Sequence, residues 1–276
     1  MMTAPVILKA YYTAPEGQVH YRYAKALVKD ETKCPIMFMH MSASSSFIYE
    51  ELMERCAAEG YDCYAPDMPG FGASYNPNNM PEGIKYYVEV FMLLAKHVGL
   101  TKFHAFGHHS GASMATEMAT LYPEQILSLT VVGPCLLTRE EQIEHTSGGL
   151  LEYGTRPVMD GSHMMKVWGI LQKQEADWDV LKMNQEAIDW IRAWEGKVQC
   201  YTNVFSQPMI KIMGDVRCPV LGMVSEKDIL YPYFPRLKEI KPDSTTAIVQ
   251  GGDWEVMKDA KGCCTAFVDF ACKLPK

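Results

Sequence analysis

The chain has 276 residues, of which 48% are hydrophobic and 21% charged, a composition typical of a folded globular protein and not of a disordered or fibrous one. Asp and Glu number 33 against 26 for Lys and Arg, so the formal net charge is -7. This acidic balance lacks the positive surface that attracts nucleic acid and anionic membranes, and we expect neither as a partner. The expected partner is a small molecule, and formation of a homodimer stays open.

The ends and the cysteines of the chain indicate a cytoplasmic protein. The first twelve residues have no basic run before an apolar stretch, and the longest apolar window, 88–100, is interrupted by Glu89, Lys96 and His97. We therefore expect neither export nor a membrane span. The nine cysteines show no CxxC or Cys/His spacing, so we expect no metal site and no disulfide framework.

Strand-like and helix-like segments alternate along the chain, which predicts a mostly parallel sheet covered by helices on both faces. Strands are expected at 6–12, 18–23, 35–39, 61–65, 102–106, 126–132, 219–224 and 246–249. The first two are predicted to pair as an antiparallel hairpin. Helices are expected up to about 59, at 83–98, after 111 and at 254–272.

One stretch departs from this alternation. From 135 to 214 the sequence is rich in Trp, Met and Glu and has no strand-like run, which predicts an inserted helical cap. The predicted organisation is the first part of an α/β core at 1–134, the cap at 135–214, and the second part of the core at 215–276.

The most informative turn is the GHHSG segment at 107–111, between a predicted strand and a predicted helix. A sharp strand-to-helix turn of this kind needs glycine-sized residues two positions before and two positions after its centre. Gly107 and Gly111 meet this need if His109 is central, whereas centring the turn on Ser110 would put His108 at a crowded position. We therefore predict a histidine at the position of a nucleophile.

Five segments resemble motifs of the α/β-hydrolase fold, in the order that family has them. FMHMSASSSF resembles the oxyanion loop, YAPDMPGFGAS the turn after the next strand, and AFGHHSGASMA the nucleophile elbow, here in an atypical form. CPVLGMVSEKDILYP resembles the strand and loop that present the acid, and IVQGGDWEV the segment that presents the histidine. The resemblance implies the α/β-hydrolase fold, with a mostly parallel sheet flanked by helices and a helical cap.

The resemblance also shows where the family's catalytic triad is incomplete. Asp228 stands at the position of the acid, but no histidine follows His163, and Trp254 or Asp253 aligns with the expected base. The Ser, His and Asp relay of the family therefore cannot be assembled at its usual places. His109, being longer than serine, is expected to reach toward Asp228 directly.

Further residues are assigned to the pocket. The resemblance implies an oxyanion hole made by the backbone N–H groups of Ser42 and Ser110, the latter at a helix N-terminus. For His163 and Trp168 in the cap, substrate contact and ordinary packing both stay open. Trp254 is expected to wall the pocket, and a tryptophan facing a pocket favours an aromatic ligand.

The leading interpretation is an enzyme with a degenerate triad and no cofactor, in which His109, supported by Asp228, transfers a proton while an oxyanion is stabilised. It would act on a small carbonyl compound, lactone or ester, aromatic and polyketide-like ones included, as a lyase, isomerase, cyclase or direct hydrolase. A relaxed triad on this scaffold is typical of specialised metabolism. Two alternatives stay open: a serine hydrolase that uses Ser110, and a non-catalytic small-molecule binding protein.

Overall fold

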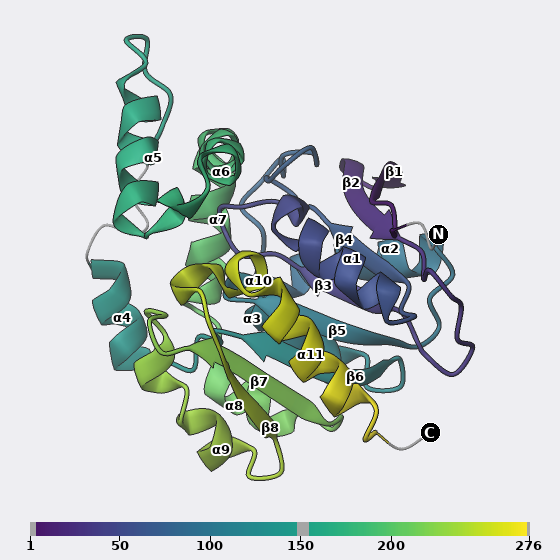
Figure 1. The fold of residues 1–276 in the computed structure, drawn as a ribbon. Helices are drawn as coiled ribbons and strands as arrows, with labels where there is room; N and C mark the ends of the chain where they lie inside the picture. Colours follow the sequence, from purple (N-terminus) through teal and green to yellow (C-terminus); the bar gives the residue numbers. More distant parts are fainter. Residues whose placement is uncertain (1–3, 148–154, 275–276) are drawn as a thin grey trace.

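The computed structural model of the protein describes residues 4–147 and 155–274, and eight strands of this part form one sheet in the order β1-β2-β4-β3-β5-β6-β7-β8 (Figure 1). The strands are β1 (Leu8–Ala14), β2 (Gly17–Ala24), β3 (Ile36–Met39), β4 (Cys63–Pro66), β5 (Phe103–His108), β6 (Ile126–Val132), β7 (Val220–Ser225) and β8 (Thr245–Val249). β2 pairs antiparallel with β1 and β4, and the other neighbours are parallel. The predicted hairpin and the mostly parallel sheet are confirmed.

Helices cover both faces of the sheet (Figure 1). α1 (Glu50–Ala58) packs against α11 (Ala260–Ala271) on one face, and α3 (Ser110–Leu121) contacts both α2 (Ile84–His97) and α8 (Met209–Asp215) on the other. Strands β3, β4, β5 and β7 are buried along their whole length, as expected when both faces of a parallel sheet are covered. The core therefore lies at the centre of the sheet.

The C-terminal helix differs from its prediction, because 254–272 is not continuous. It divides into η4 (Gly252–Trp254), α10 (Glu255–Lys258) and α11. The break lies at Asp259, whose side chain accepts a hydrogen bond from the Gly262 N–H and so caps α11. The remaining short elements are η1 (Ser46–Tyr49), η3 (Tyr231–Tyr233) and α9 (Arg236–Ile240).

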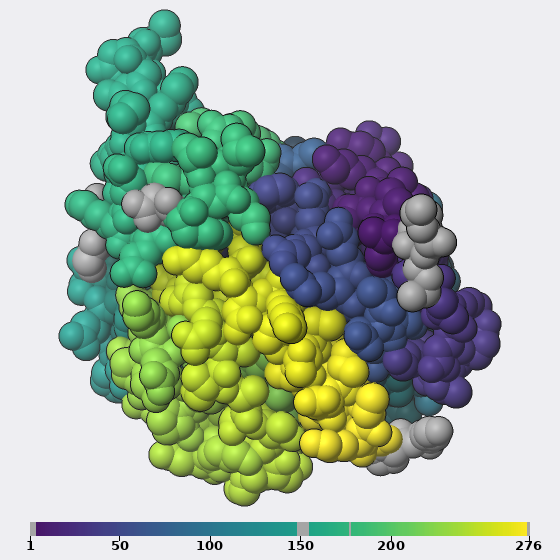
Figure 2. All heavy atoms as spheres, viewed as in Figure 1, coloured from purple at the N-terminus to yellow at the C-terminus, as the bar shows by residue number. Residues whose placement is uncertain are grey.

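The described part of the segment between β6 and β7 contains helices joined by loops, and no strand. It contains α4 (Arg139–Ser147), α5 (Ser162–Lys173), η2 (Ala176–Trp178), α6 (Val180–Arg192), α7 (Trp194–Val204) and α8. The green cap residues lie directly against the yellow C-terminal segment in Figure 2. There the Trp254 indole N–H donates to the Gln174 carbonyl at 2.8 Å, and the Lys258 ammonium donates to the Glu175 carbonyl at 2.9 Å. These bonds fasten the cap to the core.

Within the described residues, we find no helix that combines the length and the hydrophobicity needed to cross a bilayer.

Two carboxyl groups of α6 are buried against the loop that follows β3. Glu186 Oε2 accepts a hydrogen bond from the Ser44 hydroxyl at 2.6 Å, and Asp189 Oδ2 accepts one from the Ser45 hydroxyl at 2.7 Å. Burial, together with the nearby charge of Asp189, raises the pKa of Glu186 to about 8. Glu186 therefore holds a proton at neutral pH, and this contact between cap and core depends on a neutral acid.

We predict that Glu186→Gln removes part of the pH dependence of folding stability. Because burial raises the pKa of Glu186 from 4.5 to about 8 in the folded protein, its contribution is fully present below its ordinary pKa and is lost as the pH rises through about 8. Glutamine keeps the neutral shape and does not ionise. Thermal unfolding scans should show the melting temperature of the wild type falling by several degrees more than that of the variant between about pH 6 and 9.

The matched control is Glu89→Gln, at an exposed residue that forms an ion pair with Lys85, and this change should leave the wild-type curve unchanged. Parallel curves for Glu186→Gln and wild type would contradict the prediction.

Candidate active site

The turn after β5 is built around His109, which adopts φ 49° and ψ -114°. A Cβ atom on Gly107 would overlap the backbone of Gly111, and one on Gly111 would overlap the carbonyl group of Met39. Neither position can hold a side chain, so the spacing of the two glycines fixes the register of the turn. His109, and not Ser110, stands at its apex.

His109 and Asp228 form a buried pair, with His109 Nε2 at 3.0 Å from Asp228 Oδ2. Burial alone would lower the pKa of His109, but the charge of Asp228 and its hydrogen bond outweigh burial and raise the pKa to about 9. In return, the charge of His109 lowers the pKa of Asp228 against the effect of burial. At neutral pH the pair is therefore an imidazolium beside a carboxylate.

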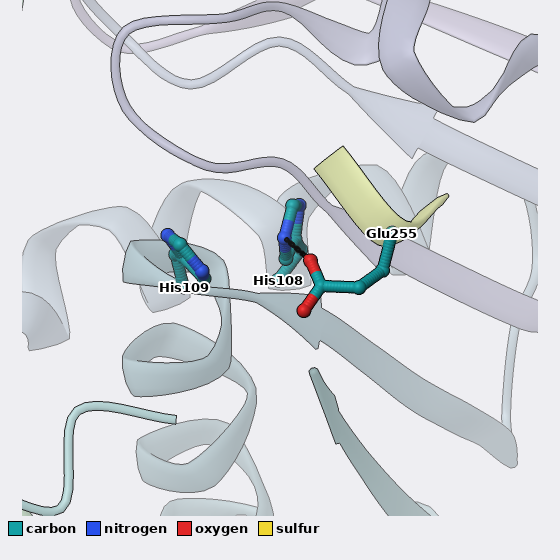
Figure 3. Close-up of side chains that lie close together, drawn as sticks. All are labelled: His108, His109 and Glu255. Atoms are coloured by element: carbon teal, nitrogen blue, oxygen red, sulfur yellow. Dashed lines mark hydrogen bonds and ion pairs between the residues drawn. The ribbon is translucent and has the colours of Figure 1, made fainter. Parts of the chain in front are cut away.

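The second ring nitrogen of His109 is left for a ligand. Nε2 faces Asp228, and none of the described residues forms a hydrogen bond with Nδ1. In Figure 3 one nitrogen of the His109 ring points away from both His108 and Glu255. The ring is 16% exposed, and it lines a cavity of about 130 Å³.

The cavity has a mainly apolar wall. Its larger apolar and aromatic side chains come from the loop after β3, the cap, the loop after β7 and the C-terminal segment, and include Met41, Trp190, Tyr201, Phe205, Leu230 and Trp254. An apolar protein cavity of about 150 Å³ holds one benzene molecule, so this cavity is sized for a group comparable to a single six-membered ring.

One of the two N–H groups assigned to an oxyanion hole is occupied by a side chain of the protein. The Ser42 N–H donates to Ser110 Oγ at 2.6 Å, and Ser110 is almost fully buried. In the described structure no imidazole is hydrogen bonded to the Ser110 hydroxyl. The Ser110 N–H stands at the start of α3, where amides have no acceptor within the helix. It can therefore meet a ligand directly, whereas the Ser42 N–H becomes available only if the Ser110 side chain turns away.

The structure does not bring His163 and Trp168 to this cavity. Both belong to α5, and the Nδ1 atom of His163 accepts a hydrogen bond from the Val158 N–H at 3.3 Å. Neither residue lines the cavity, which favours the packing interpretation for both. Trp254 does line it, as expected, and Asp253 lines it as well.

Sequence analysis missed Glu255, whose carboxyl group is fully buried behind the His109 and Asp228 pair. Its Oε2 lies 3.1 Å from His108 Nε2, and its Oε1 accepts the Ser225 N–H at 3.0 Å (Figure 3). Burial and the charge of Asp228 raise the pKa of Glu255 well above its ordinary value. The available signal was its place in IVQGGDWEV, where an acid stands between two strongly apolar residues.

Three carboxyl groups and two imidazoles lie close together around His109, and residues of these types can bind a metal cation. Potential ligand atoms lie within 4.8 Å of one another in two groups, His108 with His109 and Glu255, and His109 with Asp228 and Asp253. Both groups include His109, whose Nε2 is at hydrogen-bond distance from Asp228. We assign both groups to proton sharing.

Solved structures share this architecture across almost the whole chain. An enol-lactonase from Burkholderia xenovorans superposes with a TM-score of 0.78 at 12% identity, covering 96% of this chain and 100% of that one. An epoxide hydrolase from Vigna radiata gives 0.77 at 13% identity, covering 97% and 98%. Residues 35–153 also match the family described as alpha/beta hydrolase fold. The chain is an α/β-hydrolase-fold protein.

Among curated proteins, this α/β-hydrolase-fold protein resembles enzymes over part of their length. Proline iminopeptidase of Clostridium botulinum is 27% identical over 143 residues, which are 49% of this chain and 48% of that protein. Juvenile hormone epoxide hydrolase of Manduca sexta is 28% identical over 130 residues, 43% of this chain and 28% of that protein. The chain thus matches about half or less of the length of these relatives, of which one is named a peptidase and the other a hydrolase.

We predict that Gly133→Ala separates His109 from Asp228. Gly133 has φ +51°, and a Cβ atom there would overlap Asp228 Oδ2 and the His109 ring. Once the pair is forced apart, His109 loses the hydrogen bond and much of the charge interaction that oppose burial, so its pKa should fall from about 9 toward its ordinary value of 6.5. Titration of the His109 ring signals by NMR measures this shift.

Gly99→Ala is the matched control, because Gly99 also has a positive φ, +76°, but nothing lies within 4 Å of the added atom. It should lose stability without moving the titration of His109. If the midpoint of the His109 titration stayed near pH 9 in Gly133→Ala, the pair of His109 and Asp228 would not depend on this glycine and the prediction would be wrong.

Proposed function

We propose that this protein is an enzyme that moves a proton at an activated carbonyl substrate, with the imidazolium of His109 as proton donor. The observation that supports this most is the arrangement at the turn apex, where Nε2 of His109 is held by Asp228 at 3.0 Å and Nδ1 has no hydrogen-bond partner among the described residues. A histidine that starts protonated suits a reaction that consumes a proton.

Cleavage of a carbon–carbon bond beside a carbonyl group is such a reaction. In the decarboxylation of a β-keto acid, the bond to the carboxylate breaks, carbon dioxide leaves, and the electron pair forms an enolate. The Ser110 N–H and the His109 imidazolium would stabilise the enolate oxygen. The Nδ1–H of His109 would then give its proton to the enolate carbon, and solvent would return a proton to the neutral ring.

Isomerisation, cyclisation and direct attack by water begin instead with removal of a proton by a base. On this site they would need the neutral form of His109, which is a minority species near pH 7 because its pKa lies near 9. These reactions would run best in alkali, so the protonated state of His109 favours proton donation over them. A proton donor contributes about 10²- to 10⁴-fold to a rate, and an oxyanion donor about 10²- to 10³-fold, which suits substrates already activated.

The size and lining of the cavity restrict the substrate. About 130 Å³ accommodates a small acyl chain or one ring, and the aromatic wall that includes Trp254 and Tyr201 favours a flat or apolar group. We propose small β-keto acids, enol lactones and aryl ketones as the first compounds to screen, with product formation followed by mass spectrometry.

We predict that His109→Gln reduces turnover of a substrate found in this screen by about 10²- to 10⁴-fold. In the wild type, kcat/KM should be level from about pH 6 to 8 and fall tenfold per pH unit above about 9, where His109 loses its proton. The control is His97→Gln, an exposed residue of α2, which should keep wild-type kcat/KM. A profile that rises toward pH 9 would indicate that His109 is a base and would contradict proton donation.

A fluorophosphonate probe separates this proposal from a serine hydrolase. We predict no adduct at Ser110 by peptide mass spectrometry, because its hydroxyl is buried, is bonded to the Ser42 N–H, and has no imidazole to activate it. Ser110→Ala should therefore show the same lack of labelling as the wild type. A stoichiometric adduct at Ser110, absent in that variant, would establish the serine hydrolase alternative.

A further inference from the structure

One carboxyl group of the cavity wall has no task in the proposed proton transfer. Asp253 belongs to η4, which follows β8, and it lines the same cavity as His109. A carboxyl oxygen of Asp253 and a ring nitrogen of His109 lie within 4.8 Å of each other. A ligand that contacts His109 in this cavity is therefore also within reach of Asp253.

The two oxygens of the Asp253 carboxyl group differ in their surroundings. Oδ1 accepts a hydrogen bond from the Ile229 N–H at 2.9 Å, which fixes the side chain against the loop after β7. For Oδ2, the described residues provide no hydrogen-bond donor. Because Asp253 is only partly buried and lines the cavity, Oδ2 is the oxygen that is available to a ligand.

Two other acceptors of the cavity wall already have donors within the protein. The Ser42 carbonyl accepts a hydrogen bond from the Tyr201 hydroxyl at 2.9 Å, and the Gln174 carbonyl accepts one from the Trp254 N–H at 2.8 Å. A carboxylate is also a stronger acceptor than a carbonyl group. A hydrogen-bond donor of a ligand in this cavity would therefore be bound by Asp253 in preference to these two groups.

The charges around Asp253 select the kind of donor. The imidazolium of His109 lies within 4.8 Å, so an ammonium group of a ligand would meet a like charge at this position. A hydroxyl group carries no charge, and it donates its O–H to a carboxylate in a charge-assisted hydrogen bond. A neutral hydroxyl group therefore fits this position.

We propose that Asp253 binds a hydroxyl group of the substrate, and that the substrate is a β-hydroxy carbonyl compound. In such a compound one carbon atom separates the carbonyl carbon from the carbon that bears the hydroxyl group, so a cavity of about 130 Å³ holds both groups. The Ser110 N–H binds the carbonyl oxygen, and Asp253 Oδ2 accepts the hydroxyl hydrogen. This inference rests on the proposed function, because it takes His109 as the proton donor.

The arrangement supports aldol cleavage of this substrate. Asp253 takes the hydroxyl proton, the bond between the hydroxyl-bearing carbon and the α-carbon breaks, and the hydroxyl-bearing carbon becomes a carbonyl group. The electron pair of the broken bond forms an enolate, which the Ser110 N–H stabilises, and the His109 Nδ1–H gives its proton to the enolate carbon. Burial raises the pKa of Asp253, which makes its carboxylate a stronger base. Proton exchange with solvent restores both residues, and two carbonyl compounds leave.

Three small ketones of similar size test the proposal. β-Hydroxyethyl methyl ketone carries the hydroxyl group, methyl propyl ketone has a methyl group in its place, and β-methoxyethyl methyl ketone cannot donate a hydrogen bond. Binding is followed through the fluorescence of the cavity residues Trp190 and Trp254. The wild type should bind the hydroxy ketone about 10- to 100-fold more tightly than the other two, as expected for a hydrogen bond to a charged group.

Asp253→Asn removes the acceptor and keeps the shape of the side chain. The Ile229 N–H holds the amide oxygen, so the amide nitrogen, which is a donor, takes the place of Oδ2. The preference for the hydroxy ketone should be lost in this variant. It should be kept in Asp179→Asn, a matched change at an aspartate that accepts the Leu181 N–H and does not line the cavity. A preference that persists in Asp253→Asn would overturn the proposal.

The wild type alone also decides the proposal if Asp253→Asn does not fold. Equal affinities for the three ketones, or no saturable binding of the hydroxy ketone, would overturn it. Because binding is measured without turnover, such a result would leave the proposed function intact. Unchanged turnover in His109→Gln would instead remove the proposed function, and the preference for the hydroxyl group would remain.

Discussion

The hydrogen-bonded ion pair of His109 and Asp228 is the interaction on which the rest of the site depends. Each charge is acceptable at this depth only because the other lies 3.0 Å away, since a buried ion that loses its partner costs about 3–5 kcal/mol. The pair places steric demands on the fold around it. The elbow must hold His109 in an unusual backbone conformation, and Gly133 must present no side chain where the two groups meet.

The acids in and around this pair have pKa values that are shifted in different directions. Asp228 is driven toward its ionised form by His109, while burial raises the pKa of both Asp253 and Glu255. When neighbouring acids have different pKa values, one can act as an anion and another as a proton donor. The same principle operates in the cap, where Glu186 stays neutral against Ser44. Burial thus shifts the pKa of acids upward both in the site and at the contact between cap and core.

The sequence was sufficient for features that local sterics decide. Two glycines spaced around His109 defined the turn, and the spacing after a buried strand identified Asp228. The sequence was not sufficient to predict the contacts between side chains that come from distant parts of the chain. The bond from the Ser42 N–H to Ser110 Oγ joins two loops 68 residues apart, and the partners of Glu255 come from two other elements. His163 and Trp168 show the same limit, because periodicity gives the helix but not which of its faces meets the pocket.

Trp254 stands at a position where the family resemblance implied the base of the catalytic triad. Its ring is part of the cavity wall, and its N–H holds the Gln174 carbonyl of the cap at 2.8 Å. A ligand that displaced the Trp254 ring to enlarge the cavity would also disturb its hydrogen bond to the cap, because the same side chain makes both contacts. A substitution at Trp254 would therefore change the cavity wall and the contact between cap and core together.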